Sequence, residues 1–171
     1  MIELMLMRHA KSDWHSHTAD IDRPLSSRGV QDAIRMGATL NQMRLVPDRM
    51  VISAAKRTQD TAELLLNNLP VPEKNIIVDQ GLYLADRETL CETIELYAIN
   101  QQRLLILAHN PGMDDLVSYL ASTPLSLTVS GKLMTTSAVA CFGIDSLDVL
   151  KKSGLGELRN LLRPKELAGT K

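Results

Sequence analysis

Short apolar runs alternate along this chain with longer stretches in which apolar residues recur at every third or fourth position. The short runs predict buried strands, and we expect them at residues 2–7, 49–53, 75–78, 103–108 and 138–144. The periodic stretches predict helices at residues 26–43, 58–69, 87–99 and 111–120. Ser26 or Ser27 can cap the first helix, and Pro111 fits the first turn of the last, where its missing N–H is not needed.

The alternation of strands and helices indicates the α/β class. We expect a three-layer α/β/α sandwich with a mostly parallel central sheet, because parallel strands need helical crossovers that cover both faces. The 171 residues fit one domain spanning residues 1–171. Residues 14–24 lack periodicity and are expected to form a surface loop. Residues 146–171 form a partly helical, partly irregular tail whose path the pattern does not determine.

Composition narrows the function classes. The formal net charge is −1, which gives no sign of binding to nucleic acid or to an anionic membrane, so any positive field has to be local. The apolar N-terminal run is too short to span a membrane and lacks the basic start of a secretory signal, so we expect a cytoplasmic protein. Cys91 and Cys141 lack the CxxC spacing of a metal or redox site and are expected to be buried free thiols.

The strongest polar signals follow three of the predicted strands at their carboxyl ends. Arg8 and His9 follow the first strand, Arg57 follows the second, and His109 follows the strand at 103–108. Ligands of open α/β sheets bind at this edge. Two arginines and two histidines without a paired carboxylate favour an anion, and the predicted helix start near Pro111 would add free N–H groups, so a phosphoryl group fits best.

Each signal also has a simpler interpretation when it is taken alone. Arg8 and His9 could be a surface pair, Arg57 a solvated helix residue, and His109 a turn residue. Their ordered recurrence at three strand ends favours a shared site. His15 and His17, with Asp20 and Asp22 nearby, also suggest a metal site, but their irregular spacing argues against it, and we expect no metal and no cofactor.

Four segments together resemble the histidine phosphatase superfamily, and most of all its short bacterial branch, the SixA-type phosphohistidine phosphatases. The segments are Leu6-Met7-Arg8-His9-Ala10-Lys11-Ser12, Arg23-Pro24-Leu25-Ser26-Ser27-Arg28-Gly29, Ser53-Ala54-Ala55-Lys56-Arg57-Thr58-Gln59-Asp60-Thr61 and Ala108-His109-Asn110-Pro111-Gly112. The similarity runs from the first strand to Ile144 and on toward Pro164. It implies a phosphoglycerate mutase-like fold.

The resemblance also implies a metal-independent phosphatase that forms a phosphohistidine on its own chain. His9 would attack phosphorus with one ring nitrogen while the other, protonated, bonds a backbone carbonyl. Arg8, Arg57 and a protonated His109 would surround the phosphoryl oxygens and supply the charge of a metal ion. Arg23 would border the pocket or be a surface arginine.

Two residues that closely follow His9 keep two interpretations each. Ser12 would bond a phosphate oxygen or only satisfy the turn that follows the nucleophile. Trp14, the only tryptophan, would wall the site or merely pack the loop.

The chain departs from the larger members of the superfamily at the residues that follow its third strand. Those members place a glutamic acid there to protonate the leaving oxygen, whereas residues 79–86 contain no glutamate. Asp86 and Glu88 are nearby but displaced, and Asp86, Glu88 or solvent could supply the proton. A phosphoramidate needs a built-in acid less than an ester does, because it leaves as a neutral imidazole once protonated.

These features favour a phosphorylated protein substrate over other ligands. The absence of long insertions predicts an open site that suits phosphohistidine on a protein such as a histidine phosphotransfer domain. Two alternatives stay open: a small-molecule phosphomonoesterase of the same superfamily and a non-catalytic phosphate-binding module.

Overall fold

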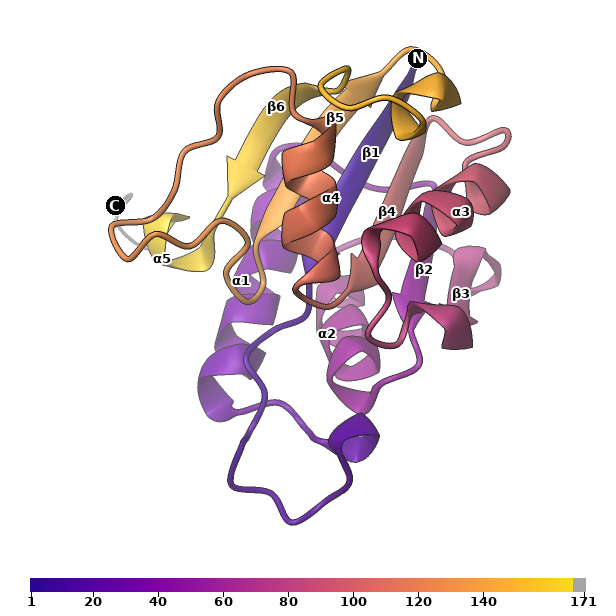
Figure 1. The fold of residues 1–171 in the computed structure, drawn as a ribbon. Coiled ribbons are helices and arrows are strands. Elements are labelled where there is room, and N and C mark those ends of the chain that lie inside the picture. Colours follow the sequence, from indigo (N-terminus) through magenta and orange to yellow (C-terminus); the bar gives the residue numbers. More distant parts are fainter. Residues whose placement is uncertain (168–171) are drawn as a thin grey trace.

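The computed structural model describes residues 1–167 and contains one six-stranded sheet (Figure 1). Its strands lie in the order β3-β2-β4-β1-β5-β6. They are β1 (Ile2–Arg8), β2 (Arg49–Ser53), β3 (Ile76–Asp79), β4 (Arg103–Ala108), β5 (Val139–Ile144) and β6 (Glu157–Leu162). β1 to β4 are parallel, whereas β5 and β6 run antiparallel to their neighbours. The sheet is therefore parallel on one side and antiparallel on the other.

Helices cover both faces of the sheet, as predicted. The helices are α1 (Ser27–Gln42), α2 (Lys56–Leu66), α3 (Arg87–Tyr97), α4 (Gly112–Leu120) and the short α5 (Pro164–Leu167). Figure 1 shows α3 and α4 in front of the sheet and α1 and α2 behind it. This is the three-layer α/β/α architecture that the alternating pattern predicted.

The side chains of residues 4–7 in β1 explain why the middle of this strand is apolar without interruption. Leu4 and Leu6 belong to the core cluster under α3 and α4, whereas Met5 and Met7 belong to the cluster under α1 and α2. Successive residues of a strand point to opposite faces, so a strand that is covered on both faces needs apolar residues at every position. All four side chains are fully buried.

Most predicted elements agree with the structure within a few residues, and two helix starts differ. Ser26 caps α1, since its side chain accepts a hydrogen bond from Gly29 N. The helix α2 begins at Lys56, before the predicted Thr58, and Ala55 precedes it without a side-chain cap. The helix α4 begins at Gly112, so Pro111 precedes the first turn rather than lying in it.

The sequence pattern missed β6, which pairs with β5 and forms the edge of the sheet. Its residues are exposed or half-buried, so its apolar pattern is weak. Residues 168–171 of the predicted tail lie outside the described part of the chain. Within residues 1–167, no helix combines the length and the apolar character needed to cross a membrane.

The two cysteines are free thiols, as predicted, but only one of them is fully buried. Cys141 lies in β5 and is buried, whereas Cys91 lies in α3 and is half-buried. The prediction of burial is therefore wrong for Cys91, because its position in α3 faces the margin of the core rather than its centre.

Candidate active site

The candidate site forms where three neighbouring parallel strands end. β1 ends at Arg8, β2 at Ser53 and β4 at Ala108, and these strands are adjacent in the sheet. His9 N donates a hydrogen bond to Ala108 O at 3.1 Å, which joins the segments after β1 and β4. The carboxyl edge predicted from the sequence is therefore one physical place.

A pocket of about 200 Å³ opens at this edge. All six predicted site residues line it, and five further residues complete the lining. The six are Arg8, His9, Ser12, Arg23, Arg57 and His109, and the five are Lys11, Trp14, Leu84, Asn110 and Thr136. The predicted convergence of these residues is confirmed, while their chemical roles stay predictions.

His9 is held through one of its ring nitrogens. The Nδ1 atom lies 2.7 Å from Ala10 O, so it carries a proton and donates to that carbonyl. The ring is 7% exposed, and Nε2 makes no hydrogen bond within residues 1–167. Burial, assisted by the nearby His109, Arg57 and Arg8, lowers the pKa of His9 to about 3. The imidazole is therefore neutral at pH 7, with an unprotonated Nε2.

The backbone beside His9 is anchored to the helix α2. Ala10 N donates to the Thr61 hydroxyl at 3.0 Å, and that hydroxyl donates to Arg57 O at 2.6 Å. Arg57 and the carbonyl that orients His9 are thus positioned by the same hydrogen-bonded unit. Thr61 belongs to the motif at residues 53–61, and these hydrogen bonds make it a positioning residue.

His109 faces His9 across the pocket, with ring centroids 5.1 Å apart. Its Nε2 lies 2.7 Å from Ser53 Oγ, which also accepts a hydrogen bond from Ala55 N. The Ser53 hydroxyl accepts from a backbone N–H, so it can donate a hydrogen bond through its O–H to His109 Nε2. In that case Nε2 is the acceptor, and the ring proton is on Nδ1. The buried Nδ1 has no protein partner among the described residues.

The structure corrects one expectation about His109. Burial and the nearby Arg57 lower the pKa of His109 to about 4. In the free protein at neutral pH this ring is therefore neutral rather than protonated. A neutral imidazole with its proton on Nδ1 still offers one N–H to an anion, so the correction changes the charge of the site and preserves the donor.

Two buried arginines are oriented by one carboxylate that the sequence reasoning did not single out for this role. Arg57 donates from Nη1 to Asp20 O at 2.7 Å and from Nη2 to Asp20 Oδ2 at 3.2 Å. Arg23 donates from Nη2 to Asp20 Oδ1 at 2.9 Å and from Nη1 to Ser12 Oγ at 2.7 Å. The Nε atoms of Arg8, Arg23 and Arg57 are buried and have no protein partner among residues 1–167.

Asp20 also links the loop to Tyr83. The Tyr83 hydroxyl donates to Asp20 Oδ2 at 2.5 Å, and the Tyr83 ring stands edge-on to the His109 ring at 5.7 Å. This hydrogen bond, together with Arg57 and Arg23, lowers the pKa of Asp20. The Asp20 carboxylate is therefore ionised at neutral pH and positions the arginines rather than serving as an acid.

The structure gives Asp20 a different role from the metal ligand considered from the sequence. No three His, Cys, Asp or Glu side chains in the described chain lie close enough together to hold a metal ion. His15 and His17 are exposed on the loop. The sequence signal for Asp20 was weak because residues 14–24 carry no periodicity, although the short helix η1 (Asp20–Asp22) forms there.

Neither Asp86 nor Glu88 lies in the pocket. Asp86 caps α3 by accepting a hydrogen bond from Thr89 N at 2.9 Å, and Glu88 pairs with Arg87. Both acids line a different surface hollow, together with Tyr119. The residues that line the His9 pocket, all within residues 1–167, include no carboxylate.

Glycines in two of the motifs allow close contacts beside the pocket. A Cβ atom on Gly29 would lie 2.0 Å from Lys11 O, which also accepts a hydrogen bond from Ser26 N. A Cβ atom on Gly112 would lie 2.1 Å from Ala85 O. The starts of α1 and α4 therefore press on the two loops that border the site, and only glycine fits there.

Two exposed apolar side chains stand at the rim of the pocket. Trp14 is 68% exposed, and the Arg23 guanidinium carbon lies 3.5 Å from the centroid of its ring. Leu84 is 57% exposed and has a φ of 51°. Trp14 lines the pocket, which was one of its two predicted roles. Ser12 Oγ accepts a hydrogen bond from Arg23, and its bond to a phosphate oxygen stays a prediction.

Comparisons with known proteins show what this chain is similar to. A family model described as the histidine phosphatase superfamily (branch 1) matches residues 4–83. An uncharacterized protein of Mycobacterium tuberculosis is 34% identical over 116 residues, which cover 68% of this chain and 70% of that protein. An uncharacterized chloroplastic protein of Arabidopsis thaliana is 27% identical over 172 residues, covering 94% and 77%.

The fold also matches a solved structure. The structure of the protein histidine phosphatase SixA complexed with tungstate aligns with a TM-score of 0.79 at 23% sequence identity, covering 97% of this chain and 99% of that chain. This likeness confirms the predicted phosphoglycerate mutase-like α/β fold.

Proposed function

This chain belongs to the histidine phosphatase superfamily and is a phosphatase, and from that premise we propose that it removes phosphate from phosphohistidine on a protein, by way of a phosphohistidine on His9. One observation carries the proposal. A neutral imidazole, held by Nδ1, lies in a pocket whose polar lining consists of N–H and O–H groups together with the amide side chain of Asn110.

His9 is the nucleophile of this proposal. Its Nδ1–H donates to Ala10 O, so the lone pair of the reactive tautomer is on Nε2. Nε2 attacks phosphorus as the bond from phosphorus to the substrate nitrogen breaks. That nitrogen keeps the electron pair, and the substrate leaves as a neutral imidazole because its other ring nitrogen already carries a proton taken from solvent. Water then attacks phospho-His9, which releases inorganic phosphate and restores the neutral ring.

Arg8, Arg57, Arg23 and His109 stabilise the phosphoryl oxygens in this proposal. Buried N–H groups without a protein partner are costly unless a ligand accepts from them, and four of these side chains carry such a nitrogen. Charge stabilisation by prearranged donors supplies most of the rate enhancement in phosphoryl transfer. Residues that are fixed by Asp20 and Ser53 need little rearrangement when the charge develops.

The groups that line the pocket favour a phosphoramidate substrate over a phosphate ester. The lining of the pocket within the described chain offers no carboxylic acid that could protonate an alkoxide. Asp20 is not among the residues that line the pocket, and its pKa is lowered, so it is a poor proton donor. A phosphohistidine takes its proton from solvent on an exposed imidazole nitrogen, which suits a pocket of this kind.

The rim favours a protein as the carrier of that phosphohistidine. Trp14 and Leu84 line the pocket and are 68% and 57% exposed. Exposed aromatic and aliphatic side chains beside a site are typical of protein contact surfaces. A phosphorylated helix, such as that of a histidine phosphotransfer domain, could place its imidazole in the pocket while its surface covers these two residues. SixA, whose structure this chain resembles, is named a protein histidine phosphatase.

The test compares wild type with His9→Ala, and with His17→Ala as a control in an exposed loop position. Each protein is mixed with a radiolabelled phosphohistidine peptide, quenched in alkali and analysed for label on the chain. We expect label and turnover in wild type and His17→Ala, and neither in folded His9→Ala. Faster turnover of p-nitrophenyl phosphate than of the peptide would instead favour a small-molecule esterase, and absence of label in wild type would favour a binding module.

A further inference from the structure

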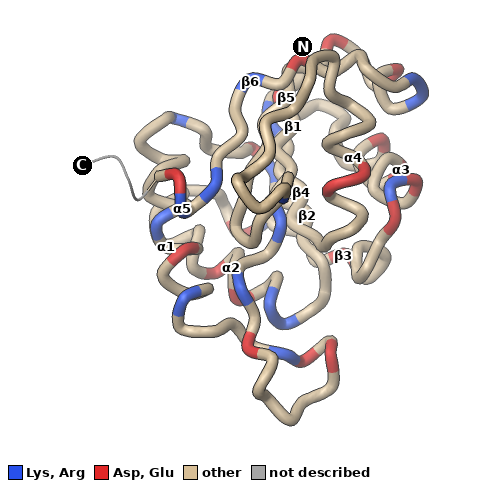
Figure 2. The backbone as a smooth tube through the Cα atoms, turned by 60° about the vertical axis from the view of Figure 1, so that its left-hand side comes forward, with Lys and Arg blue, Asp and Glu red and all other residues tan. Residues whose placement is uncertain are grey.

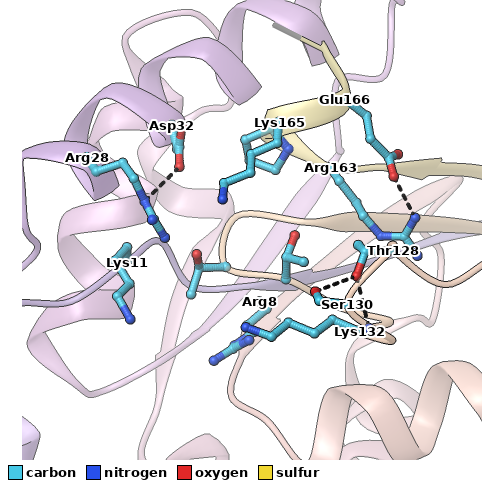
Figure 3. A pocket seen from close by; sticks show the side chains of 13 residues that line it. Arg8, Lys11, Arg28, Asp32, Thr128, Ser130, Lys132, Arg163, Lys165 and Glu166 are labelled. Carbon is cyan, nitrogen blue, oxygen red and sulfur yellow. Dashed lines mark hydrogen bonds and ion pairs between the residues drawn. The ribbon is translucent and has the colours of Figure 1, made fainter. Parts of the chain in front are cut away.

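A second hollow lies beside the pocket that contains His9 and has a similar volume of about 200 Å³ (Figure 3). Arg8, Lys11 and Thr136 line both hollows, so the two are continuous at these residues. We call the second hollow the basic groove. Its further lining residues used below are Arg28, Lys132, Arg163, Lys165, Asp32 and Glu166.

Three segments that are far apart in the sequence build the basic groove. The start of α1 supplies Arg28 and Asp32, the connection between α4 and β5 supplies Lys132, and the end of β6 with α5 supplies Arg163 and Lys165. Figure 3 shows these side chains around one hollow, with Lys11 and Arg8 at its side. The groove is thus a product of the tertiary fold.

Arg163 holds two of these segments together. It is 3% exposed and donates to Leu133 O at 2.9 Å, to Ser126 O at 2.5 Å and to Glu166 Oε1 at 2.9 Å. A buried arginine with these partners fixes the wall of the groove rather than facing a ligand. The position of Lys132 is set in the same way by a tight turn, in which Thr128 N donates to Lys132 O at 2.9 Å.

The charges of the basic groove are unbalanced. Six lining residues are Lys or Arg and two are Asp or Glu, although the whole chain carries −1. Asp32 is shared between Arg28 and Arg35, and Glu166 pairs with Arg163.

The lysines of the groove therefore lack carboxylate partners. Lys11, Lys132 and Lys165 form no ion pair with any residue of the described chain. Burial lowers the pKa of Lys11 most, and repulsion from the neighbouring Arg28, Arg8 and Lys132 lowers it further.

We propose that the basic groove binds an acidic segment of the phosphorylated protein, namely Asp and Glu side chains that flank its phosphohistidine. The proposal rests on the proposed function, because it concerns the same substrate. The free cations are mostly lysines spread along separate walls. Such point charges suit several carboxylates along a chain, whereas a single phosphate is best held by converging arginine forks.

The distribution of charge on the rest of the surface supports this orientation of the partner. Figure 2 shows mostly acidic positions along α3 and α4, and basic positions beside α1 and α5 with a few acidic ones among them. The acidic ones include Glu92, Glu95 and Asp115. A segment rich in Asp and Glu would be repelled from α3 and α4 and drawn toward the groove, so the field selects one way of docking.

The experiment uses two phosphohistidine peptides of the same length, one with Asp and Glu beside the phosphohistidine and one with Asn and Gln. Free phosphohistidine serves as the small substrate. We expect kcat/KM of wild type to be about tenfold higher for the acidic peptide than for the neutral one. This advantage should vanish toward about 1 M salt, where the Debye length is about 3 Å.

The matched variant is the double charge reversal Lys132→Glu with Lys165→Glu, because both side chains are exposed and neither lies in the His9 pocket. It should abolish the preference for the acidic peptide and leave free phosphohistidine turnover within about twofold of wild type. The control is Lys152→Glu, an exposed lysine outside both hollows, which should keep the preference. A thermal melt checks that the double variant is folded.

The two proposals fail in different ways. Equal turnover of both peptides by wild type, with free phosphohistidine still hydrolysed, would overturn the role of the groove and leave the proposed function intact. If no phosphohistidine substrate is hydrolysed, the proposed function fails, and fluorescence anisotropy with a labelled acidic peptide still tests the groove. If the double variant bound the labelled acidic peptide as tightly as wild type, the proposed role of the groove would be overturned. If the double variant lost only the turnover of a bisphosphorylated small molecule, the groove would be a site for the second phosphate of that molecule rather than for an acidic segment.

Discussion

Replacement of Arg57 by lysine separates the charge of this residue from its geometry. The side chain is 2% exposed and uses both Nη atoms on Asp20, which leaves its buried Nε–H for a ligand. A lysine would retain the positive charge but would have to choose between Asp20 and the phosphoryl group, because its ammonium is a single centre. Arg57→Lys therefore tests whether the planar fork itself is required.

The expected magnitude follows from the loss of one prearranged contact. Removing such a donor costs about 2.7–4 kcal/mol in the barrier, which is roughly 10²- to 10³-fold in rate. We expect Arg57→Ala near the upper end, and Arg57→Lys to lose about 10²-fold because its retained charge is poorly placed. Arg57→Ala should also lower the free energy of unfolding by about 1–2 kcal/mol, since Asp20 is partly exposed and keeps Arg23 and Tyr83 as partners.

Single-turnover labelling of His9 and steady-state kcat/KM with a phosphohistidine peptide measure the effect, and urea unfolding measures stability. The matched control is Lys56→Ala, the neighbouring exposed residue, whose only ion pair in the described chain is with Asp60 at 3.1 Å. This control should keep its activity and lose at most about 0.5 kcal/mol of stability. Wild-type activity in Arg57→Lys would refute the argument from the fork, and wild-type activity in Arg57→Ala would refute any contact of Arg57 with phosphate.

Three further predictions address the rest of the site. Ser53→Ala removes the hydroxyl that lies 2.7 Å from His109 Nε2, and kcat should fall about tenfold or more because the ring proton is no longer held on Nδ1. The free energy of unfolding should also fall by about 1–3 kcal/mol, because the buried Nε2 loses its hydrogen-bond partner. The pKa values of about 3 for His9 and about 4 for His109 lie below the ordinary 6.5. As the pH falls, these two imidazoles therefore take up protons in the unfolded chain before they do so in the folded protein. Stability should therefore be constant above about pH 6.5 and fall by several kcal/mol toward about pH 4, and urea titrations of His9→Gln should show a shallower fall. Gly29→Ala places a Cβ atom 2.0 Å from Lys11 O and should cost about 1–3 kcal/mol of stability in a thermal melt, together with a loss of turnover, and an unchanged variant would contradict the close contact.

The sequence predicted the strands that carry the site because both faces of each strand are covered. β2 and β4 span residues 49–53 and 103–108, as predicted, and a site residue follows each strand: Arg57 lies four positions after β2, and His109 directly follows β4. The pattern failed where burial is partial or a local signal is missing. β6 is an edge strand with no fully buried residue, and α2 starts after Ala55, which provides no side-chain cap.

The residues that arrange the site were harder to predict than those that line it. Asp20 lies in a loop without periodicity, and its partners Arg57 and Tyr83 are 37 and 63 positions away. Such contacts depend on how the loop folds back over the sheet edge. Bonds at its base, such as Asp13 N to Pro24 O at 2.9 Å, fix that path, and no local propensity encodes it.

The arrangement of charges explains how three arginines and two histidines can share so small a space. Both imidazoles are neutral, because burial lowers their pKa values to about 3 and about 4, so the repulsion among cations is limited to the arginines and Lys11. Asp20 balances part of that charge while leaving the Nε atoms of Arg23 and Arg57 without a partner among residues 1–167. A phosphoryl dianion that enters the pocket would complete this balance, and its charge would raise the pKa of His109 toward the ordinary range. In the proposed mechanism, His109 holds the phosphoryl group through its Nδ1–H and gives no proton to the leaving group. This arrangement favours a substrate whose leaving imidazole is protonated by solvent over an ester, which needs an acid in the site.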